Sequence, residues 1–355
     1  MGQATAAQLK NRPTLHSAIN VHTTLQNLQR RRLPPAIIRF APLLALNVFC
    51  KYFIATGPWQ LDQPLTAAQV AEFLRQGFLV IETPFIPKSE LEWCSKILMR
   101  MLESGQGRSE GRNLDLVARD GGEDTTLPSV LQPSLYATEL RNFSYRKTAL
   151  AIAKQLLGPE ADFAGDHTIF KPVHKGGPTP WHQDEAFREP GFEYDEISIW
   201  IAMTDSTIEN GAMAYIPGSH LLGVLPHRLN GGAKEANTIE CYTGFDPKTA
   251  AVRPIPAGAM IIHHGRTIHG ASGNKTNTPR LAYILQYSMP VRISKVIREA
   301  PWLKHLRSAI RLRRKSFLLR GGILPELLRV LRSDRHSVAF FWRRRVNHLR
   351  NLFKN

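Results

Sequence analysis

The period of the hydrophobic positions changes along the chain, and each change predicts a different element. In LTAAQVAEFLRQGFLVI, Val70, Phe73 and Leu74 recur at helical spacing, Thr66 is a suitable N-cap, and the pattern stops at Gly77. It predicts a helix that begins near Thr66, ends at Gly77 and leads into a strand. A second helix is predicted over SELEWCSKILMRMLE, which carries these apolar residues on one face: Leu91, Cys94, Ile97, Leu98 and Met101.

The helical pattern then gives way to β-like patterns. Residues 104–130 are rich in Gly, Asp, Arg and Ser without any period, which predicts a long loop of the kind that forms lids or binding segments. After about residue 163, turn dipeptides such as Asn210-Gly211 and Pro217-Gly218 separate short apolar runs: HTIFKPV, ISIWIAMTD, AMAYIPG, AVRPIPAG, AMIIHHG and RLAYILQYSM. Short, regularly interrupted strands favour a sandwich, barrel or jelly roll over a parallel sheet.

These patterns divide the chain into three parts. Residues 61–290 form the predicted body, and residues 1–60 precede it as a basic, partly hydrophobic extension. Residues 291–355 return to helical patterning, with Leu303, Leu306 and Ile310 on one side and arginines largely on another. We therefore predict a mainly β protein with flanking helices and helical N-terminal and C-terminal extensions.

The distribution of charge strengthens this division. The 355 residues carry a net charge of +17: residues 1–56 hold 7 basic and no acidic residues, residues 57–290 hold 21 and 26, and residues 291–355 hold 18 and 3. A mildly acidic body thus lies between two basic ends. Such ends are suited to an anionic partner, whereas the body is the place to look for chemistry.

Cysteine usage and hydropathy indicate the compartment. Cys50, Cys94 and Cys241 are odd in number and far apart, which excludes a disulfide framework and a CxxC metal site and fits a reducing environment. The uncharged run from Phe40 to Cys50 has 11 residues, fewer than the roughly 20 that a spanning helix needs. We predict a cytoplasmic protein, with peripheral contact with an anionic membrane as one interpretation of the basic ends.

The stretch TPWHQDEAF contains candidate metal ligands. On a strand, His182 and Asp184 point to the same face while Gln183 points away. A site of two imidazoles and one carboxylate, with positions left open, would bind non-haem iron(II). A lone HxD pair is a weak signal, and its third ligand must come from a distant strand such as AMIIHHGRTIHGA, which offers His263, His264 and His269.

An arginine follows this strand. Arg280 opens the apolar run RLAYILQY, and a guanidinium in an apolar cavity needs an anionic partner. Its planar fork matches a carboxylate in bidentate fashion. Together the residues could hold a metal and a dicarboxylate.

At these motifs the sequence resembles the phytanoyl-CoA dioxygenase family. The resemblance covers roughly residues 65–290 and rests on LTAAQVAEFLRQGFLVI, HTIFKP, WHQDEAF, ISIWIAMTDSTIENGAMAYIPGSH and GRTIHGASGNKTNTPRLAYILQY, in that order. It implies a double-stranded β-helix and an oxygenase that uses Fe(II), 2-oxoglutarate and O2, with ascorbate as the reductant. It also implies release of succinate and CO2 during hydroxylation of a C–H bond, with desaturation or cyclisation as alternatives.

The resemblance also assigns roles to residues. It makes His182, Asp184 and His269 the iron ligands and sets Arg280 against the distal carboxylate of 2-oxoglutarate. The expected cosubstrate contacts are Trp200, Ile169 and Ser272, although Ala271 stands where relatives can place a serine. We interpret His263, His264 and His220 as structural residues.

Two function classes remain open at this point. The first is an oxygenase acting on a small or lipid-like substrate. The second is a non-catalytic β-helix that acts as an adaptor through its basic ends. The ends themselves suit a membrane surface or simple packing on the body, while nucleic acid is supported by charge but by no motif.

Overall fold

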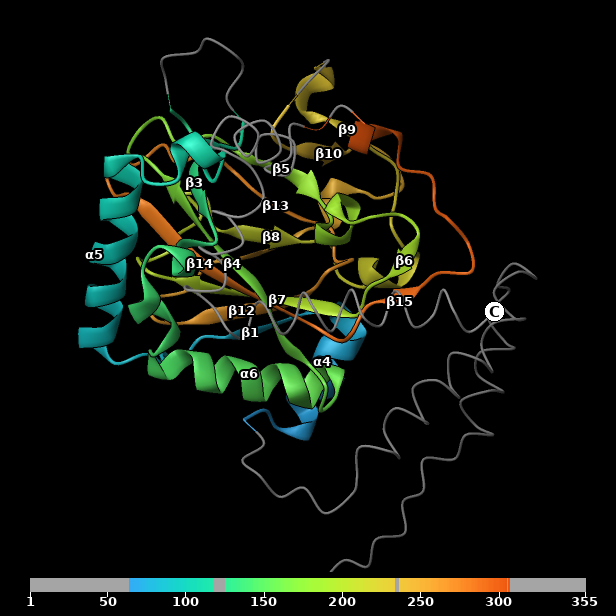
Figure 1. The fold of residues 1–355 in the computed structure, drawn as a ribbon, viewed down its shortest axis with the longest axis horizontal. Helices are drawn as coiled ribbons and strands as arrows, with labels where there is room; N and C mark the ends of the chain where they lie inside the picture. Colours follow the sequence, from blue (N-terminus) through green and yellow to red (C-terminus); the bar gives the residue numbers. More distant parts are fainter. Residues whose placement is uncertain (1–63, 118–124, 234–235, 305, 307–355) are drawn as a thin grey trace, which may run out of the picture. The chain divides into compact units, whose positions relative to one another are not determined.

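Two antiparallel sheets form the centre of the computed structural model, which describes residues 64–117, 125–233, 236–304 and 306 (Figure 1). The larger sheet consists, in order across the sheet, of β1 (Phe78–Ile81), β12 (Met260–His264), β7 (Glu196–Ala202), β14 (Arg280–Ser288), β4 (Asp162–Lys171), β3 (Pro128–Leu131) and β2 (Asn113–Asp115). The smaller sheet consists of β11 (Ala251–Arg253), β8 (Met213–Tyr215), β13 (His269–Ala271) and β5 (Thr179–His182). The predicted mainly β architecture is confirmed.

Two short strand pairs, three α-helices and several 3-10 turns complete the described elements. The pairs are β9 (His227–Leu229) with β10 (Ile239–Cys241), and β6 (Phe192–Glu193) with β15 (Arg292–Ile293). The helices are α4 (Ala67–Gln76), α5 (Lys88–Ser104) and α6 (Ser144–Leu157). Figure 1 shows α6 running along the large sheet on the side away from β5, β8 and β13.

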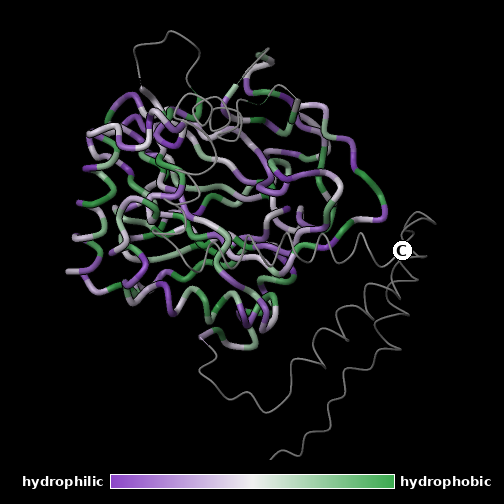
Figure 2. Tube along the Cα trace, viewed as in Figure 1, coloured by the Kyte–Doolittle hydropathy of each residue, from purple (hydrophilic) through white to green (hydrophobic). Residues whose placement is uncertain are grey.

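Strand β7 explains how the two layers are held together. All seven of its residues are buried, because each of its faces packs on a different core. Ile199 and Ile201 point toward the helices and join a cluster with Cys94 and Tyr145, whereas Trp200 points between the sheets. A strand covered on both sides needs apolar residues at nearly every position, and this is why ISIWIA shows no alternation. Figure 2 shows the same concentration of hydrophobic colour along the central strands.

Helix α4 begins and ends as its sequence predicts. The Thr66 side chain accepts a hydrogen bond from the Gln69 amide, and the Gln69 side chain binds back to the Thr66 amide, which is a capping box. Gly77 closes the helix with a left-handed backbone (φ 80°) and donates to the Phe73 carbonyl. The second predicted helix is also confirmed, as α5.

The prediction of one long loop over residues 104–130 is wrong. This segment contains a 3-10 turn (Arg108–Glu110) and the strands β2 and β3, which add an edge to the large sheet. The sequence of this segment shows no alternation of apolar and polar residues, because strands of three or four residues are too short to show such a pattern. Helix α6 was also missed, since its apolar positions are diluted by Lys, Arg and Gln.

The predicted extensions lie mostly outside the described residues. This holds for residues 1–60 and for the tail from residue 307 onward. The described beginning of the C-terminal part is not a helix: it forms β15 and then a 3-10 turn, η8 (Pro301–Lys304). Within the described ranges, no helix combines the length and the apolar character that crossing a membrane requires.

Candidate active site

Two histidines face each other across the smaller sheet. His182 ends β5, His269 begins β13, and the two residues are directly paired in the register of these antiparallel strands. Directly opposed side chains share one face of a sheet, and here the ring centroids lie 4.2 Å apart. Strand pairing therefore brings the distant histidine beside the HxD motif, as the sequence requires.

Backbone carbonyl groups orient both imidazoles. Nδ1 of His182 lies 2.8 Å from the carbonyl oxygen of Pro180, and Nδ1 of His269 lies 2.9 Å from that of Thr267. A carbonyl oxygen only accepts, so each Nδ1 carries the proton and each Nε2 keeps a free lone pair. Burial, reinforced by the neighbouring imidazoles, lowers the pKa of His269 well below its usual value and keeps that ring neutral. Neutral imidazole is the form that binds metal.

Asp184 lies on a turn and not on the predicted strand. Strand β5 ends at His182, and a one-turn 3-10 helix, η4 (Asp184–Phe187), begins two residues later. Gln183 between them keeps an extended backbone (φ −121°, ψ 132°), so His182 and Asp184 still project to one side while Gln183 is buried on the other. His182 and Asp184 therefore point to the same side, as predicted, because a single extended residue between them is enough to produce this arrangement.

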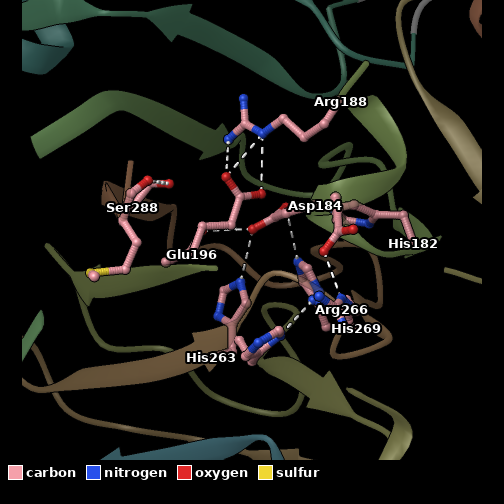
Figure 3. Close-up of polar contacts among 12 residues, drawn as sticks. His182, Asp184, Arg188, Glu196, His263, Arg266, His269 and Ser288 are labelled. Carbon is pink, nitrogen blue, oxygen red and sulfur yellow. Dashed lines mark hydrogen bonds and ion pairs between the residues drawn. The ribbon is translucent and has the colours of Figure 1, made fainter. Parts of the chain in front are cut away.

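The two oxygens of the Asp184 carboxylate have different partners (Figure 3). Oδ1 lies 3.7 Å from Nε2 of His182 and 3.8 Å from Nε2 of His269. Oδ2 accepts a 2.6 Å hydrogen bond from the Ser198 hydroxyl. The same oxygen lies 3.3 Å from Nε2 of His263. One oxygen is thus held by the protein, and the other faces the two histidines.

Electrostatics keep this carboxylate charged. Burial by itself raises the pKa of Asp184, but the imidazoles of His182, His263 and His269 outweigh it and hold this pKa well below the usual value. The group is therefore ionised throughout the physiological range.

The three side chains converge on one point. The ligand atoms of His182, Asp184 and His269 all lie within 4.8 Å of one another. Two nitrogen lone pairs and one carboxylate oxygen meet there without a proton between them, so the arrangement repels itself unless a cation occupies the point. Two imidazoles and one carboxylate, with further positions open, form the donor set of non-haem iron(II) oxygenases. The residues present therefore fit ferrous ion.

A buried arginine with free donors lies in the same interior. Arg280 is fully buried at the start of β14, and its Nη1 donates a 2.5 Å hydrogen bond to the Gly211 carbonyl. Within the described part of the chain, its Nε and Nη2 have no hydrogen-bond partner. Its Cζ lies 5.2 Å from the centroid of the Trp200 ring. Burial lowers the pKa of Arg280 to about 9, which leaves it charged at neutral pH. Two free, coplanar donors on a buried cation suit a bound carboxylate.

Lys171 is a second buried basic residue that the sequence analysis missed. It is fully buried, pairs directly with Arg280 across β4 and β14, and donates from Nζ to the Gly177 carbonyl. Burial, assisted by Arg280, lowers the pKa of Lys171 to about 6. A lysine inside the apolar run HTIFKP was the available signal.

The structure brings some of the predicted cosubstrate contacts together and leaves one apart. Trp200 and Ile169 are 2% and 9% exposed and belong to the cluster between the sheets. Ser272 is exposed, and its hydroxyl lies 3.5 Å from the Ile208 carbonyl. Ala271 faces the cluster in its place, because alternation along β13 puts residue 271 on the side of His269.

His167 also escaped the sequence analysis. It pairs with Ile284, which in turn pairs with Trp200, so these residues form one row across the inner face of the large sheet. Burial lowers the pKa of His167 to about 4, while Asp184 acts in the opposite direction. His167 lies two residues before Ile169 on β4, so the two side chains share a face of the strand. This spacing was the available signal that His167 faces the same interior as Ile169.

The remaining histidines behave largely as predicted. His220 Nε2 lies 3.1 Å from the Leu74 carbonyl at the end of α4, and His264 accepts a hydrogen bond from the Arg266 amide in a turn. His263 is a strand residue, but it also contacts Asp184 and lies 3.4 Å from the Tyr215 hydroxyl. Its role is therefore more specific than the structural one expected from the sequence.

Comparison with known proteins agrees with this site. The chain is similar to a probable alpha-ketoglutarate-dependent hypophosphite dioxygenase of Stutzerimonas stutzeri (28% identity over 62% of this chain and 78% of that protein). It is also similar to an ectoine dioxygenase of Halomonas elongata (29% identity over 62% of this chain and 69% of that protein). Among solved structures, EvdO2 from Micromonospora carbonacea var. aurantiaca matches 67% of this chain and 97% of its own, with 28% identity and a TM-score of 0.59.

EvdO2 has also been solved in complex with 2-oxoglutarate, and that structure matches with a TM-score of 0.57. The family model described as phytanoyl-CoA dioxygenase (PhyH) matches residues 73–282. This range includes the three residues of the triad and also Arg280. The resemblance noted from the motifs is confirmed: the chain belongs to the phytanoyl-CoA dioxygenase family of iron(II)- and 2-oxoglutarate-dependent oxygenases.

Proposed function

We propose that this protein hydroxylates an unactivated C–H bond of a small or lipid-like substrate, using iron(II) held by Nε2 of His182, Oδ1 of Asp184 and Nε2 of His269. The observation that carries the proposal is Arg280, a fully buried guanidinium with two unpaired donors in the interior that also holds the triad. An unsatisfied buried donor typically costs about 1–3 kcal/mol, and a carboxylate bound to Nε and Nη2 of Arg280 would remove this cost at both donors. This argues against the adaptor hypothesis.

In this proposal Arg280 binds the distal carboxylate of 2-oxoglutarate, with Trp200 and Ile169 as apolar walls. Trp200 places its ring against the guanidinium, and an ion pair inside an apolar surrounding is stronger than one in water. We further infer that the two sheets are the halves of a double-stranded β-helix, an inference supported by the similarity to EvdO2 over two thirds of the chain.

When bound, iron(II) and 2-oxoglutarate supply the oxidation: O2, 2-oxoglutarate and the C–H substrate yield succinate, CO2 and the hydroxylated product. The chain's own residues prepare this chemistry. The Pro180 and Thr267 carbonyls fix the tautomers of the two histidines, and Ser198 holds Oδ2 of Asp184, which leaves Oδ1 toward the two imidazoles, where it would bind the iron. The apolar cluster around Trp200 excludes water.

The test is formation of succinate by the full chain with iron(II), ascorbate and 2-oxoglutarate. We expect slow, substrate-independent turnover that the variant Asp184→Ala lacks. Asp246→Ala, which removes an exposed carboxylate that caps a short turn, is the matched control. Equal succinate formation, or equal iron binding, by the Asp184→Ala variant and the unaltered chain would reject the proposal.

Contact with a membrane surface stays a prediction. The basic residues that carry it lie mainly beyond the described part of the chain. Within that part, the loop after β15 exposes Val296 and Ile297 to 75% and 74%, beside Lys295, and Figure 2 shows hydrophobic colour along this projecting loop. Exposed apolar side chains next to a cation are typical of interfacial contacts.

A further inference from the structure

The chain beyond the large sheet returns to the turn that carries Asp184. Strand β15 pairs with β6, the strand that follows this turn, and Figure 1 shows the two lying side by side. Arg298 then donates from Nη2 to the carbonyl of Glu185 at 2.7 Å and to that of Arg188 at 2.8 Å. Trp302 donates from its indole nitrogen to the carbonyl of Ala186 at 2.9 Å. Two side chains thus bind three carbonyl groups of one short turn.

These contacts replace hydrogen bonds that the turn cannot make internally. A helix leaves its last carbonyl groups without intrahelical partners, and a one-turn 3-10 helix has few internal bonds to begin with. In η4, Arg188 donates its amide to the Glu185 carbonyl, but the carbonyls of Ala186 and Arg188 depend on Trp302 and Arg298. Without them these two carbonyl groups would lose the hydrogen bonds that the described residues give them.

Apolar packing holds the same segment in place. Trp302 is 7% exposed and packs in a cluster with Ala186, which is fully buried, and with Leu229, Ile239 and Leu306. The Trp302 ring also lies 5.3 Å from His227, centroid to centroid. The contact is therefore an internal part of the domain and not a loose surface association.

A separate set of hydrogen bonds holds Gln183, the residue that precedes the Asp184 turn. The Gln183 side chain donates to the carbonyls of Gly223 and Arg266 and accepts from the Leu225 amide, while the Gln183 backbone amide donates to Nε2 of His227. The Asp184 turn is consequently fixed at its start by Gln183 and at its end by Arg298 and Trp302.

We propose that residues 292–302 form a strap, and that Arg298 and Trp302 are positioning residues that set the direction of the Asp184 carboxylate. The inference rests on the proposed function, because the object that the strap positions is the iron ligand. It follows that the segment predicted to be a separate extension contributes to the metal site. Removing the hydrogen bonds of either Arg298 or Trp302 would let the turn move, and the position of Oδ1 of Asp184 relative to the two histidines would then be less well defined.

The test compares metal binding by the full chain and three variants. Trp302→Phe keeps an aromatic ring in the cluster and removes the N–H. Arg298→Met removes the two hydrogen bonds that Nη2 donates, and Arg298→Lys restores a charged nitrogen that can donate. Arg292→Met is the control, since Arg292 lies in the same segment and, among the described residues, its side chain forms an exposed ion pair with Glu193 instead of binding the Asp184 turn. Trp93→Phe, at a tryptophan that is 49% exposed on α5, controls for loss of an indole.

Anaerobic Fe(II) titration should show about tenfold weaker binding for Trp302→Phe and Arg298→Met, the low end of what outer contacts of a metal site contribute. Arg298→Lys should recover part of the loss, and both controls should match the unaltered chain. The visible absorption of bound Co(II) should change in the two strap variants, which reports coordination geometry rather than stability. The KM for 2-oxoglutarate should change less than about threefold, because the Arg280 end is untouched.

Unchanged Fe(II) affinity and an unchanged Co(II) spectrum in folded strap variants would overturn the proposal. If those variants fail to fold, hydrogen exchange of the unaltered chain decides: Fe(II) should protect residues 183–189 and 292–302 together, and protection of the first segment alone would refute the strap. Failure of the unaltered chain to bind Fe(II) at all would instead count against the proposed function.

Discussion

His263 Nε2 lies 3.3 Å from Oδ2 of Asp184, the carboxylate oxygen turned away from the other two histidines. On its other side, Nδ1 of His263 lies 3.4 Å from the Tyr215 hydroxyl. The tyrosine can donate to Nδ1, which leaves Nε2–H to donate to the carboxylate. A third imidazole therefore supports the candidate metal ligand without being part of the ligand set.

Substitution of His263 tests this support. His263→Phe should weaken Fe(II) binding by about 10–100-fold, as loss of outer contacts usually does, because Asp184 would keep only Ser198 on Oδ2. His263→Gln can still donate a hydrogen bond and should retain more affinity. Anaerobic Fe(II) titration measures both. His264→Gln, at the next position of β12, should behave as the unaltered chain, and an equal loss there would point to general disruption of the strand.

The two unpaired donors of Arg280 predict opposite effects on catalysis and stability. Arg280→Met should raise the KM for 2-oxoglutarate by at least about 30-fold, because a charged, bidentate contact is worth about 2–3 kcal/mol, with a smaller effect on kcat. The metal-free variant should melt at a higher temperature, since a buried charge without a partner disappears. Steady-state kinetics measures the predicted change in KM, and thermal unfolding measures the predicted change in melting temperature. A variant that is less stable and has an unchanged KM would contradict the role assigned to Arg280.

The pKa of Arg280 adds a pH dependence. Because only the protonated guanidinium attracts a carboxylate, binding of 2-oxoglutarate should be constant below about pH 9 and weaken as the pH rises through that value. The measurement is the dissociation constant of 2-oxoglutarate from pH 7 to 10. Affinity that is flat across this range would mean that the carboxylate binds elsewhere.

Lys171 should make stability depend on pH. Its pKa is about 6 in the folded chain and near 10.5 when unfolded, so the unfolded state binds more protons between these values and folding is favoured as pH rises. The stability of the unaltered chain relative to Lys171→Met should therefore increase from pH 6 to 10, by up to about 1.4 kcal/mol per pH unit. Denaturant unfolding measures it, with the exposed Lys96→Met as a control that should show no such trend.

Gly77 is required for steric reasons. It has a left-handed backbone, and an added Cβ would come within 2.4 Å of Nδ1 of His220. Gly77→Ala should lower the free energy of unfolding by at least about 2 kcal/mol, from backbone strain and overpacking together. Gly191→Ala, where a Cβ would meet nothing within 4 Å, should be nearly neutral. Similar stabilities of the two variants would contradict this account of the helix end.

The sequence predicted elements wherever a pattern ran long enough to be read. Helix α4, helix α5 and the apolar strands β7, β12 and β14 were expected from periodicity and turn residues. The strands β2 and β3 were not, because they are too short to alternate visibly and gain their place only by pairing with β4. Tertiary hydrogen bonds, which no local pattern records, decided that part of the fold.

The site divides in the same way. Spacing and resemblance singled out His182, Asp184, His269 and Arg280, because imidazole and charged side chains are unusual beside such apolar runs. Ser198 and Lys171 were not predicted as site residues, because a serine or lysine in an apolar run is usually a structural residue without a functional role. Their proximity to the acid and the arginine depends on strand register, which the sequence leaves open.

The direct pairing of His182 with His269 links assembly of the sheet to assembly of the site. A slip of one residue between β5 and β13 would place Trp181 or Gly270 in the pair that the two histidines now form. Correct docking of these two strands and the ability to capture an ion are thus a single event, so uptake of metal can serve as a direct readout of native topology.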